Sequence, residues 1–269
     1  IIYPLPFMKI YLDTIGCRLN QAEIENMARG FRAAGHEIVA SAELAEMAVV
    51  NTCAVTNDAV SVSRGKIRQI ARAGVNDIVA TGCWTTLQPE RALELPNVTR
   101  GVPLPGLHRR TRAFIKAQDG CNNQCTFCIT TVARGEARSR TIADVIHDIQ
   151  FARDGGTKEI VLTGVHLGSW GYEFDSRLTQ LIQAILRETD APRLRLSSLE
   201  PWDLTSDFFS LWQDSRLMPH LHLPLQAGSD STLKRMRRNT TASSFRELIR
   251  SAREAIPDVA ITTDIIAGF

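Results

Sequence analysis

The sequence predicts an α/β protein in which an N-terminal parallel-sheet domain is followed by a partial barrel of β/α units. Short apolar segments of strand length alternate with longer segments whose apolar residues recur at helical spacing. Prolines and a glycine interrupt this alternation between Pro96 and Arg112, after which it resumes. We therefore expect domains at residues 8–96 and 113–269, joined by a linker over residues 97–112. At about 150 residues per domain, 269 residues have room for both.

The first domain is predicted to alternate strands and helices. Its first helix carries Ile24, Met27 and Phe31 on one face and is closed by Gly35, which suits a helix end. In chain order, the expected elements are strand Lys9–Leu12, helix Ala22–Ala34, strand Ala48–Val50, helix Ala59–Ala73 and strand Asp77–Ala80. Strands alternating with helices in this way favour a Rossmann-like parallel sheet with helices packed on it.

The second domain repeats the rhythm over more units. Consecutive β/α units with right-handed crossovers can curl into a barrel or part of one. The expected strands are Ala113–Ala117, Glu159–Leu162, Arg193–Leu196, His220–Leu223 and Ala260–Ile265, with helices such as Ile142–Arg153 and Arg177–Glu188 between them. Because the sequence stops at Phe269, just after a strand, we expect the barrel to be truncated and the natural chain to continue.

The composition is that of a folded globular protein. Hydrophobic residues make up 44% and charged residues 22%, which excludes disorder as the main state, and no apolar run reaches the roughly 20 residues of a membrane helix. A net charge of +2 is too balanced to indicate a nucleic-acid partner by itself. The basic residues gather in 109–112, 134–140 and 234–238, where a solvated surface is the simplest interpretation of any one cluster. Nothing marks secretion, so we expect a cytoplasmic protein.

Three of the six cysteines lie within eight residues, directly after a predicted strand. Cys121, Cys125 and Cys128 can surround one centre. A structural zinc ion would normally take four protein ligands, and no fourth cysteine or histidine lies close in sequence. A cubic iron–sulfur cluster held by three thiolates would keep one iron open for another ligand. A zinc loop or an electron-carrying cluster remains an alternative.

The other three cysteines stand far apart in sequence but in equivalent places. Cys17, Cys53 and Cys83 each follow the carboxyl end of a predicted parallel strand. In an open α/β sheet those ends share one crevice, where ligands collect. One such cysteine alone would be read as a buried core residue. Three cysteines in equivalent places favour a second cluster held by three thiolates.

The C-x3-C-x2-C loop, with Phe127 before its last cysteine, resembles the signature of radical S-adenosylmethionine (SAM) enzymes. This resemblance implies a 4Fe-4S cluster whose open iron chelates the amino and carboxylate groups of SAM. An electron from the reduced cluster then splits the sulfonium to give a 5′-deoxyadenosyl radical. Phe127 matches the aromatic position that packs near the adenine.

From Met8 to Phe269 the layout resembles the radical-SAM methylthiotransferases, whose N-terminal domain holds an auxiliary cluster. Gly16–Gln21 and Asn51–Thr56 look most like the branch that acts on threonylcarbamoyladenosine in tRNA. The resemblance implies two 4Fe-4S clusters, SAM, a cellular electron donor and the anticodon loop of tRNA. One SAM would methylate a sulfur at the auxiliary cluster. A second would give the radical that removes hydrogen from an adenine carbon before the methylthio group moves there.

The same resemblance implies further contacts to SAM in the barrel. The glycine pair would let backbone carbonyls reach the SAM amino group, Ser198 and Glu200 would contact its sugar, and Gln226 would line the pocket. The implied cofactor-binding residues are Phe127, Gly155, Gly156, Ser198, Glu200 and Gln226. A helix cap explains the glycines equally well, and satisfied polar groups explain the others. We expect His166 and His222 to be hydrogen-bonded pocket residues and not metal ligands.

Three departures from the family pattern keep alternatives open. Thr157 stands where an acidic residue is usual, Ile129–Thr131 replaces the usual Ile-Pro, and the linker is short. The arginines of 134–140 could meet RNA phosphate or the SAM carboxylate, or could be structural. The substrate could also be isopentenyladenosine in tRNA or a ribosomal-protein aspartate. A non-catalytic iron–sulfur or zinc protein is the alternative of another class.

Overall fold

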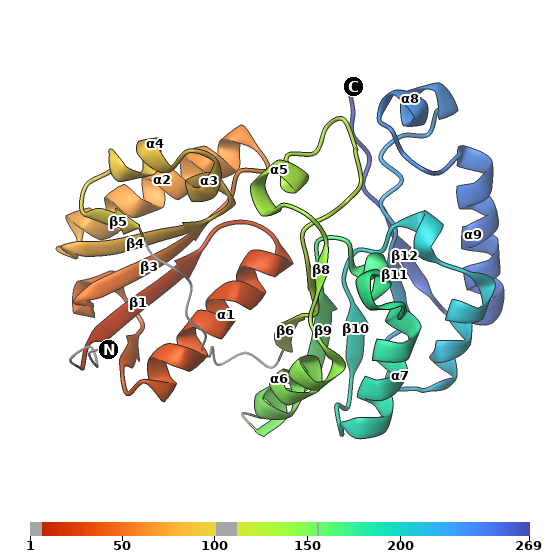
Figure 1. The fold of residues 1–269 in the computed structure, drawn as a ribbon, viewed down its shortest axis with the longest axis horizontal. Helices are drawn as coiled ribbons and strands as arrows, with labels where there is room; N and C mark the ends of the chain where they lie inside the picture. The colour runs from red at the N-terminus through yellow and green to blue at the C-terminus, as the bar shows by residue number, and fades with distance from the viewer. Residues whose placement is uncertain (1–6, 101–111, 155) are drawn as a thin grey trace. The chain divides into compact units, whose positions relative to one another are not determined.

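The computed structural model describes residues 7–100, 112–154 and 156–269 and divides into two compact units (Figure 1). Unit 1 is Ile1–Arg109 and unit 2 is Arg110–Phe269. Among the described residues, no helix is long and apolar enough to cross a bilayer.

Unit 1 is built on a five-stranded sheet in the order β2-β1-β3-β4-β5, with every pair parallel. Its strands are β1 (Lys9–Thr14), β2 (Glu37–Val39), β3 (Met47–Thr52), β4 (Asp77–Gly82) and β5 (Val98–Arg100). Its helices are α1 (Arg18–Ala33), α2 (Asn57–Arg72), α3 (Cys83–Leu87) and α4 (Pro89–Leu93), with a 3₁₀ turn at Ala42–Leu44. This strand order is the flavodoxin-like form of the doubly wound sheet, whose switch point lies between β1 and β3.

Strand β3 shows why the sheet needs helices on both faces. All six of its residues are buried, as expected of a central parallel strand. Met47 and Val49 pack with the apolar face of α1, whereas Ala48 and Val50 pack with α2 and Trp84 on the other face. Successive side chains point to opposite faces of a strand, so the apolar run of β3 fills both cores.

Strand β5 corrects part of the predicted linker. Val98–Arg100, which we placed in the linker, instead pairs with β4 through Ile78↔Val98. Asn97 makes the preceding turn at φ +62°, and its side-chain amide donates to the Val75 carbonyl at 3.0 Å. Parallel pairing with an existing strand edge therefore organises a segment too short to show a pattern of its own. The predicted linker residues 101–111 lie outside the described residues.

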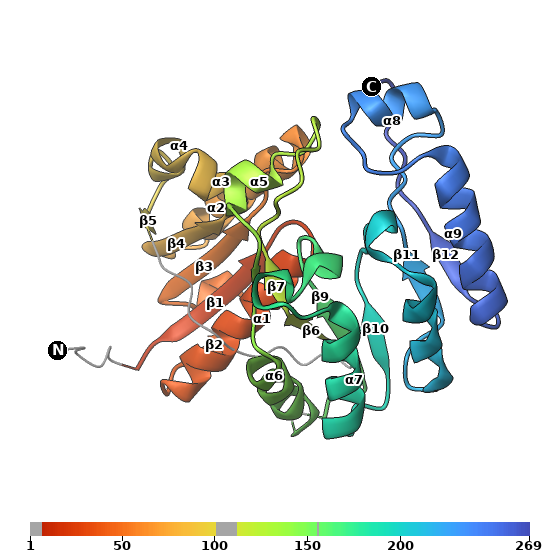
Figure 2. The same ribbon diagram turned by 45° about the vertical axis from the view of Figure 1, so that its right-hand side comes forward.

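Unit 2 carries five parallel strands in barrel-like succession (Figures 1 and 2). They are β6 (Arg112–Lys116), β9 (Glu159–Thr163), β10 (Leu194–Leu196), β11 (His220–His222) and β12 (Ala260–Thr262). The sheet β10-β9-β6 and the pair β11-β12 are linked by the bridges Leu194↔Leu217 and Ser198↔His222. Helices α6 (Ile142–Asp154), α7 (Leu178–Glu188) and α9 (Ala242–Ala255) lie along the outer side. One apolar core runs through all of these elements.

Shorter elements fill the connections of unit 2. They are β7 (Gln118–Asp119), α5 (Thr130–Arg134), β8 (Arg138–Ser139), α8 (Asp230–Arg235) and the 3₁₀ turns Leu167–Ser169, Tyr172–Phe174, Pro201–Asp203 and Ser206–Gln213. The strand-to-helix loops gather at the carboxyl ends of the strands, where β/α barrels carry their functional residues.

The opposite, amino-terminal end of the strands is held by one carboxylate. Glu159 at the start of β9 pairs with Arg112 of β6 at 2.7 Å, Arg195 of β10 at 2.9 Å and Arg193 at 3.1 Å. Burial raises the pKa of Glu159, but the arginines outweigh burial and hold that pKa below its ordinary value. Ion pairs to a single carboxylate thus join three neighbouring strands at this end of the barrel.

Candidate functional site

The cysteine loop, Cys121–Cys128, lies between β7 and α5 in unit 2. Each of its three sulfurs accepts a hydrogen bond. The donors are the Asn123 amide to Cys121 Sγ at 3.4 Å, the Thr130 amide to Cys128 Sγ at 3.4 Å and Arg238 Nη1 to Cys125 Sγ at 3.7 Å. A sulfur that accepts such a bond is held in place, and cysteine binds metal ions through its sulfur. Burial raises the pKa of Cys125, and Arg238 opposes that rise.

A glycine without room for a side chain fixes the start of this loop. Gly120 has φ +68°, and a Cβ built on it would lie 1.9 Å from the carbonyl oxygen of Glu136. The Cys121 amide donates to the Gly135 carbonyl at 3.1 Å. The side-chain amide of Gln118, which is buried, donates to the Gly120 carbonyl at 2.8 Å. The backbone therefore determines where Cys121 stands.

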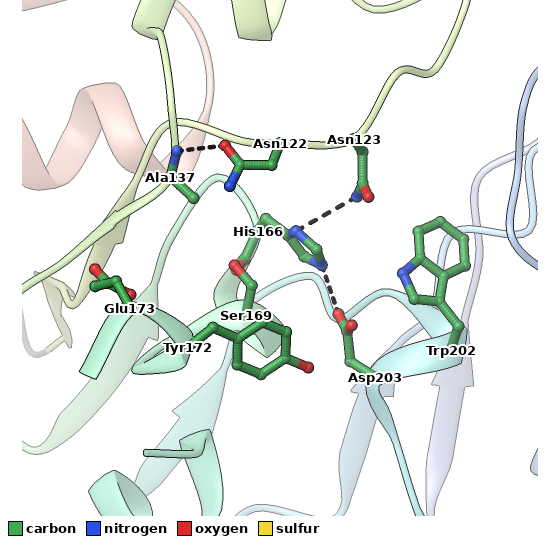
Figure 3. Close-up of a pocket in the computed structure, with 9 residues that line it drawn as sticks. All are labelled: Asn122, Asn123, Ala137, His166, Ser169, Tyr172, Glu173, Trp202 and Asp203. Carbon is green, nitrogen blue, oxygen red and sulfur yellow. Dashed lines mark hydrogen bonds and ion pairs between the residues drawn. The ribbon is translucent and has the colours of Figure 1, made fainter. Parts of the chain in front are cut away.

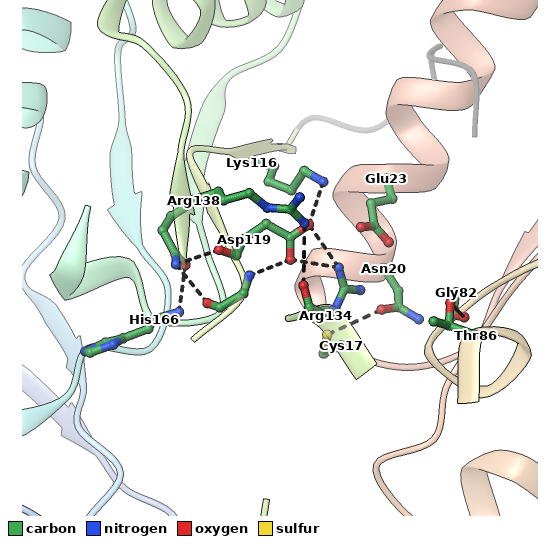
Figure 4. Close-up of polar contacts among 12 residues, drawn as sticks. Cys17, Asn20, Glu23, Gly82, Thr86, Lys116, Asp119, Arg134, Arg138 and His166 are labelled. Atoms are coloured by element: carbon green, nitrogen blue, oxygen red, sulfur yellow. Dashed lines mark hydrogen bonds and ion pairs between the residues drawn. The ribbon is translucent and has the colours of Figure 1, made fainter. Parts of the chain in front are cut away.

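Carboxylates bind two of the arginines near the loop, and Figure 4 shows Asp119 beside Arg134. The Asp119 carboxylate binds Lys116 Nζ and Arg134 Nη1, each at 3.1 Å. Burial raises the pKa of Asp119, but these two cations outweigh burial and hold the pKa below its ordinary value. Arg140 binds Asp148 at 2.7 Å. Arg134 and Arg140 thus have the structural role that the sequence left open.

A cavity of about 540 Å³ opens beside the cysteine loop (Figure 3). It is lined by Asn122, Asn123, Ala137, His166, Ser169, Tyr172, Glu173, Trp202 and Asp203. His166 Nε2 lies 2.6 Å from Asp203 Oδ2, and His166 Nδ1 lies 3.9 Å from Cys121 Sγ. Burial lowers the pKa of His166, but the bonds to Asp203 and Cys121 prevail and raise it to about 10. The prediction that His166 is a hydrogen-bonded pocket residue is confirmed.

Two of the implied SAM-binding residues pack against the segment that follows β11. Phe127 contacts the apolar group of Ala227, Leu233 and Met236. Glu200 accepts a hydrogen bond from Arg238 Nη2 at 2.6 Å. Both residues therefore lie on the loop side of the barrel strands.

The other implied SAM-binding residues are placed by the backbone. Ser198 is exposed at the end of β10, where it bridges to His222. Gln226 has φ +75°, a left-handed conformation that is rare for a residue with a side chain, and its amide donates to the Asp264 carbonyl at 2.9 Å. Gly156 has φ +84° and closes α6 by donating to the Arg153 carbonyl at 2.8 Å. Gly155 lies outside the described residues.

The cysteines of unit 1 follow three neighbouring strands, β1, β3 and β4. The register pairs Thr14 with Asn51 and Thr52 with Gly82, so these strands end nearly level. A Cβ on Gly16 would lie 2.9 Å from Cys53 Sγ. A Cβ on Gly82 would lie 2.3 Å from the Thr52 carbonyl oxygen. The glycines before Cys17 and Cys83 thus both touch the end of β3, beside the switch point.

Asn20 connects the first two of these loops. Its side-chain amide donates to the Ile15 carbonyl at 2.9 Å and to the Thr52 carbonyl at 3.1 Å. Its Oδ1 lies 3.7 Å from Cys17 Sγ (Figure 4). Cys17 is exposed, whereas Cys53 and Cys83 are buried.

Neither cysteine trio is arranged around a single ion. In the described part of the chain, no three histidine, cysteine or acidic side chains are placed to hold one metal ion. No disulfide joins any of the six cysteines. A zinc ion needs its ligands about 2.3 Å away, whereas a cubic cluster spreads them over separate iron corners.

Comparison with known proteins assigns both parts of the chain. Residues 9–102 match the family described as uncharacterized protein family UPF0004, and residues 115–269 match the radical SAM superfamily. Threonylcarbamoyladenosine tRNA methylthiotransferases of Bacillus subtilis and Thermotoga maritima are 34% and 35% identical over 97% of this chain and 67% and 68% of theirs. The chain belongs to the radical SAM methylthiotransferase family.

The name of another relative of this methylthiotransferase gives a different substrate. A tRNA-2-methylthio-N(6)-dimethylallyladenosine synthase of Acidothermus cellulolyticus is 32% identical over 95% of the chain and 60% of its own length. Among solved structures, the radical SAM methyltransferase TsrM of Kitasatospora setae aligns with a TM-score of 0.63 at 14% identity, over 97% of this chain and 69% of that one. This likeness confirms the predicted fold class.

The sequence did not reveal two buried polar contacts of the methylthiotransferase, one to Cys125 and one to His166. Arg238 was read as one member of the surface cluster 234–238, yet it is buried against Cys125. Asp203, which orients His166, had no motif around it. Both contacts join segments far apart in sequence, so no local pattern could identify them.

Proposed function

We propose that this methylthiotransferase adds a methylthio group to an adenine carbon of N6-threonylcarbamoyladenosine next to the anticodon of tRNA. The observation that carries the proposal is the cysteine loop, in which every sulfur accepts a hydrogen bond at the loop end of the barrel. The names of the relatives from Bacillus subtilis and Thermotoga maritima support this substrate.

Cys121, Cys125 and Cys128 would hold a 4Fe-4S cluster, and SAM would bind at its open iron. Together these groups supply the one-electron chemistry that an adenine C–H bond requires, because such a bond is not acidic enough for a general base. The chain's own residues hold this site in place. Gly120 and Gln118 fix the start of the loop, and the other implied contacts would orient SAM. Those contacts are Phe127, Gly155, Gly156, Ser198, Glu200 and Gln226.

Cys17, Cys53 and Cys83 would hold a second 4Fe-4S cluster in the N-terminal domain, residues 8–96. Two features support this assignment. The cysteines follow neighbouring parallel strands at the switch point, where doubly wound sheets bind ligands. Gly16 and Gly82 leave no space for side chains beside the end of β3, so the three loops stay close together. This cluster would carry the sulfur that becomes the methylthio group.

The polar lining of the cavity favours a polar substituent on the adenine. His166 and Asp203, together with the two asparagines and Tyr172, offer hydrogen-bonding groups that suit a threonylcarbamoyl chain. An isopentenyl group could form no hydrogen bond with these polar groups, whereas a threonylcarbamoyl chain could add to the bonds they already make. Methylthiolation of isopentenyladenosine is the second candidate, because the relative from Acidothermus cellulolyticus is named a tRNA-2-methylthio-N(6)-dimethylallyladenosine synthase.

The substrate and partners follow from this chemistry. A base in the anticodon loop can be splayed out of its stack, as single-stranded bases are when proteins recognise them. The enzyme would draw its electron from a cellular donor and would work in the cytoplasm. The barrel domain, residues 113–269, would carry the SAM chemistry.

Anaerobic reconstitution tests the cluster assignment. The unaltered chain should bind about eight irons, four per cubic cluster. Cys17→Ala should bind about four and still form 5′-deoxyadenosine from SAM under reducing conditions. Cys125→Ala is the reciprocal control and should form none. Retention of both clusters in Cys17→Ala would contradict the assignment in unit 1.

Purified tRNAs distinguish the substrates. We expect the reconstituted chain to methylthiolate tRNA bearing threonylcarbamoyladenosine and to leave tRNA bearing isopentenyladenosine unchanged. The nucleosides are measured by mass spectrometry after digestion, and Cys17→Ala serves as the inactive control. Modification of the isopentenyl substrate alone would refute the proposed branch.

A further inference from the structure

A short segment distant in sequence binds the cysteine loop from outside. The clamp segment, Arg235–Arg238, begins at the last residue of α8. The Thr126 amide donates to the Met236 carbonyl at 3.2 Å, and the Thr126 hydroxyl donates to the Arg235 carbonyl at 3.1 Å. Arg237 Nη1 donates to Gln124 Oε1 at 3.1 Å. The loop is therefore fixed along its middle as well as at its start.

Arg238 is the innermost residue of the clamp segment. Its side chain is 1% exposed. Besides Cys125 Sγ, its guanidinium binds Glu200 Oε2 at 2.6 Å and the Pro224 carbonyl, and it lies over the Trp202 ring at 4.5 Å from the centroid. The planar fork of arginine can reach several acceptors at once, which a lysine ammonium cannot reproduce.

One atom of Arg238 shows that stability alone does not explain the residue. Its Nε is buried and has no hydrogen-bond partner among the described residues. Leaving a buried donor unsatisfied is costly, and a guanidinium cannot lose its proton to reduce that cost. An apolar residue would fill the same space without this cost. The positive charge beside Cys125 therefore calls for a functional reason.

We propose that Arg238 is a positioning residue for the cluster of the cysteine loop: it fixes Cys125 and places a permanent positive charge beside that ligand. The inference rests on the proposed function, because it takes Cys121, Cys125 and Cys128 as cluster ligands. Hydrogen bonds to ligand sulfurs and nearby charge set the reduction potential of iron–sulfur clusters. Reduction adds negative charge to the cluster, so a cation next to a ligand sulfur stabilises the reduced state and makes reduction easier.

Glu200 gives the clamp a second connection. It lies on the loop after β10 and binds the same guanidinium nitrogen that reaches Pro224. Arg238 thus links the cysteine loop to a residue that we assign to the SAM site. A change at Arg238 should alter both the potential of the cluster and its spectroscopic response to SAM.

The test uses the full chain, reconstituted anaerobically. Arg238→Met removes the charge and its donors at similar length, and Arg238→Lys keeps a charge but loses the fork. Lys234→Met is the matched control, because Lys234 is an exposed cation of α8 that lies outside the clamp segment. Redox titration followed by electron paramagnetic resonance gives the potential of the cluster whose signal changes when SAM is added. Iron content and circular dichroism confirm loading and folding.

We expect Arg238→Met to disfavour reduction about tenfold, a shift of about 59 mV to more negative potential for a one-electron couple. Arg238→Lys should shift the potential less, and Lys234→Met should leave it unchanged. Unchanged potentials in both Arg238 variants, with normal iron content, would overturn the inference. Should Arg238→Met fail to fold, the potential of Arg238→Lys alone tests the inference: a shifted potential supports it, and an unchanged potential overturns it. Failure of the unaltered chain to load a SAM-responsive cluster would instead refute the proposed function.

Discussion

Gly82→Ala offers a sharp test of how unit 1 places its cysteines. Gly82 ends β4 at φ +90° and ψ −172°, a region that residues with side chains rarely adopt. A Cβ there would lie 2.3 Å from the carbonyl oxygen and 2.7 Å from the nitrogen of Thr52, and 2.2 Å from Asn51 Oδ1. Because two of these atoms belong to the backbone of a central strand, the strand itself would have to shift.

The cost is the sum of two effects. Backbone strain at such a position amounts to about 1–3 kcal/mol, and overpacking in a closed site adds about 1–3 kcal/mol. We therefore expect a loss of about 4 kcal/mol, a large fraction of the roughly 5–15 kcal/mol that stabilises a typical protein. Gly74→Ala is the matched control. Gly74 has φ +98°, but nothing lies within 4 Å of its Cβ position, so only the strain applies.

Hydrogen exchange on the full chain, followed by mass spectrometry of the peptide that contains β4, measures this loss locally. A change of about 4 kcal/mol accelerates exchange about a thousandfold, because every 1.4 kcal/mol is a factor of ten. Gly82→Ala should also lose the iron of the unit 1 cluster on reconstitution, whereas Gly74→Ala should keep it. Equal exchange rates and equal iron content in the two variants would refute the reasoning.

Two further predictions concern charge. Glu159→Gln should destabilise unit 2 by about 2 kcal/mol at neutral pH, a value discounted because Arg112 and Arg193 are half exposed. Since the pKa of Glu159 is lowered, its contribution is present above the ordinary carboxyl pKa and is lost as pH falls, so the unfolding curves of variant and parent should converge in acid. Asp203→Asn should lower the pKa of His166 from about 10, as a histidine NMR titration would show. The raised pKa stabilises the fold fully below pH 6.5, and this contribution is lost as pH rises through about 10. Asp203→Asn should therefore weaken the pH dependence of stability in that range and leave the part due to Cys121; an unchanged titration would exclude Asp203 as a cause.

The sequence predicted the elements that have a pattern of their own. Lys9–Leu12 and Asp77–Ala80 lie inside β1 and β4, and helix Ile142–Arg153 ends one residue before α6 does. Strands β2 and β5, of three residues each, were missed. Such short segments carry no readable alternation, and they become strands only because β1 and β4 offer unpaired edges.

In the candidate sites too, local motifs could be predicted from the sequence and tertiary contacts could not. The cysteine loop could be recognised because its three cysteines lie within eight residues of sequence. The positions that Cys17, Cys53 and Cys83 share, after neighbouring strands, could be foreseen from the β/α rhythm. The environment of each sulfur could not, because Arg238 reaches Cys125 across 113 positions of the chain. Tertiary contacts of that kind leave no trace in local composition.

The cysteines are placed by two different physical means, and this difference has experimental consequences. Cys17, Cys83 and Cys121 each follow a glycine with positive φ at which a Cβ would come within 3 Å of a neighbouring atom. At Gly82 and Gly120 the atoms that such a Cβ would meet include backbone, which cannot yield, whereas at Gly16 they are side-chain atoms of Cys53 and Asn20. Substitution of Gly82 or Gly120 should therefore remove the proposed cluster. Cys125 is instead steadied by the side chain of Arg238, which can be shortened or neutralised while the loop backbone stays in place. Substitution at Arg238 should therefore change the potential of a cluster that still forms.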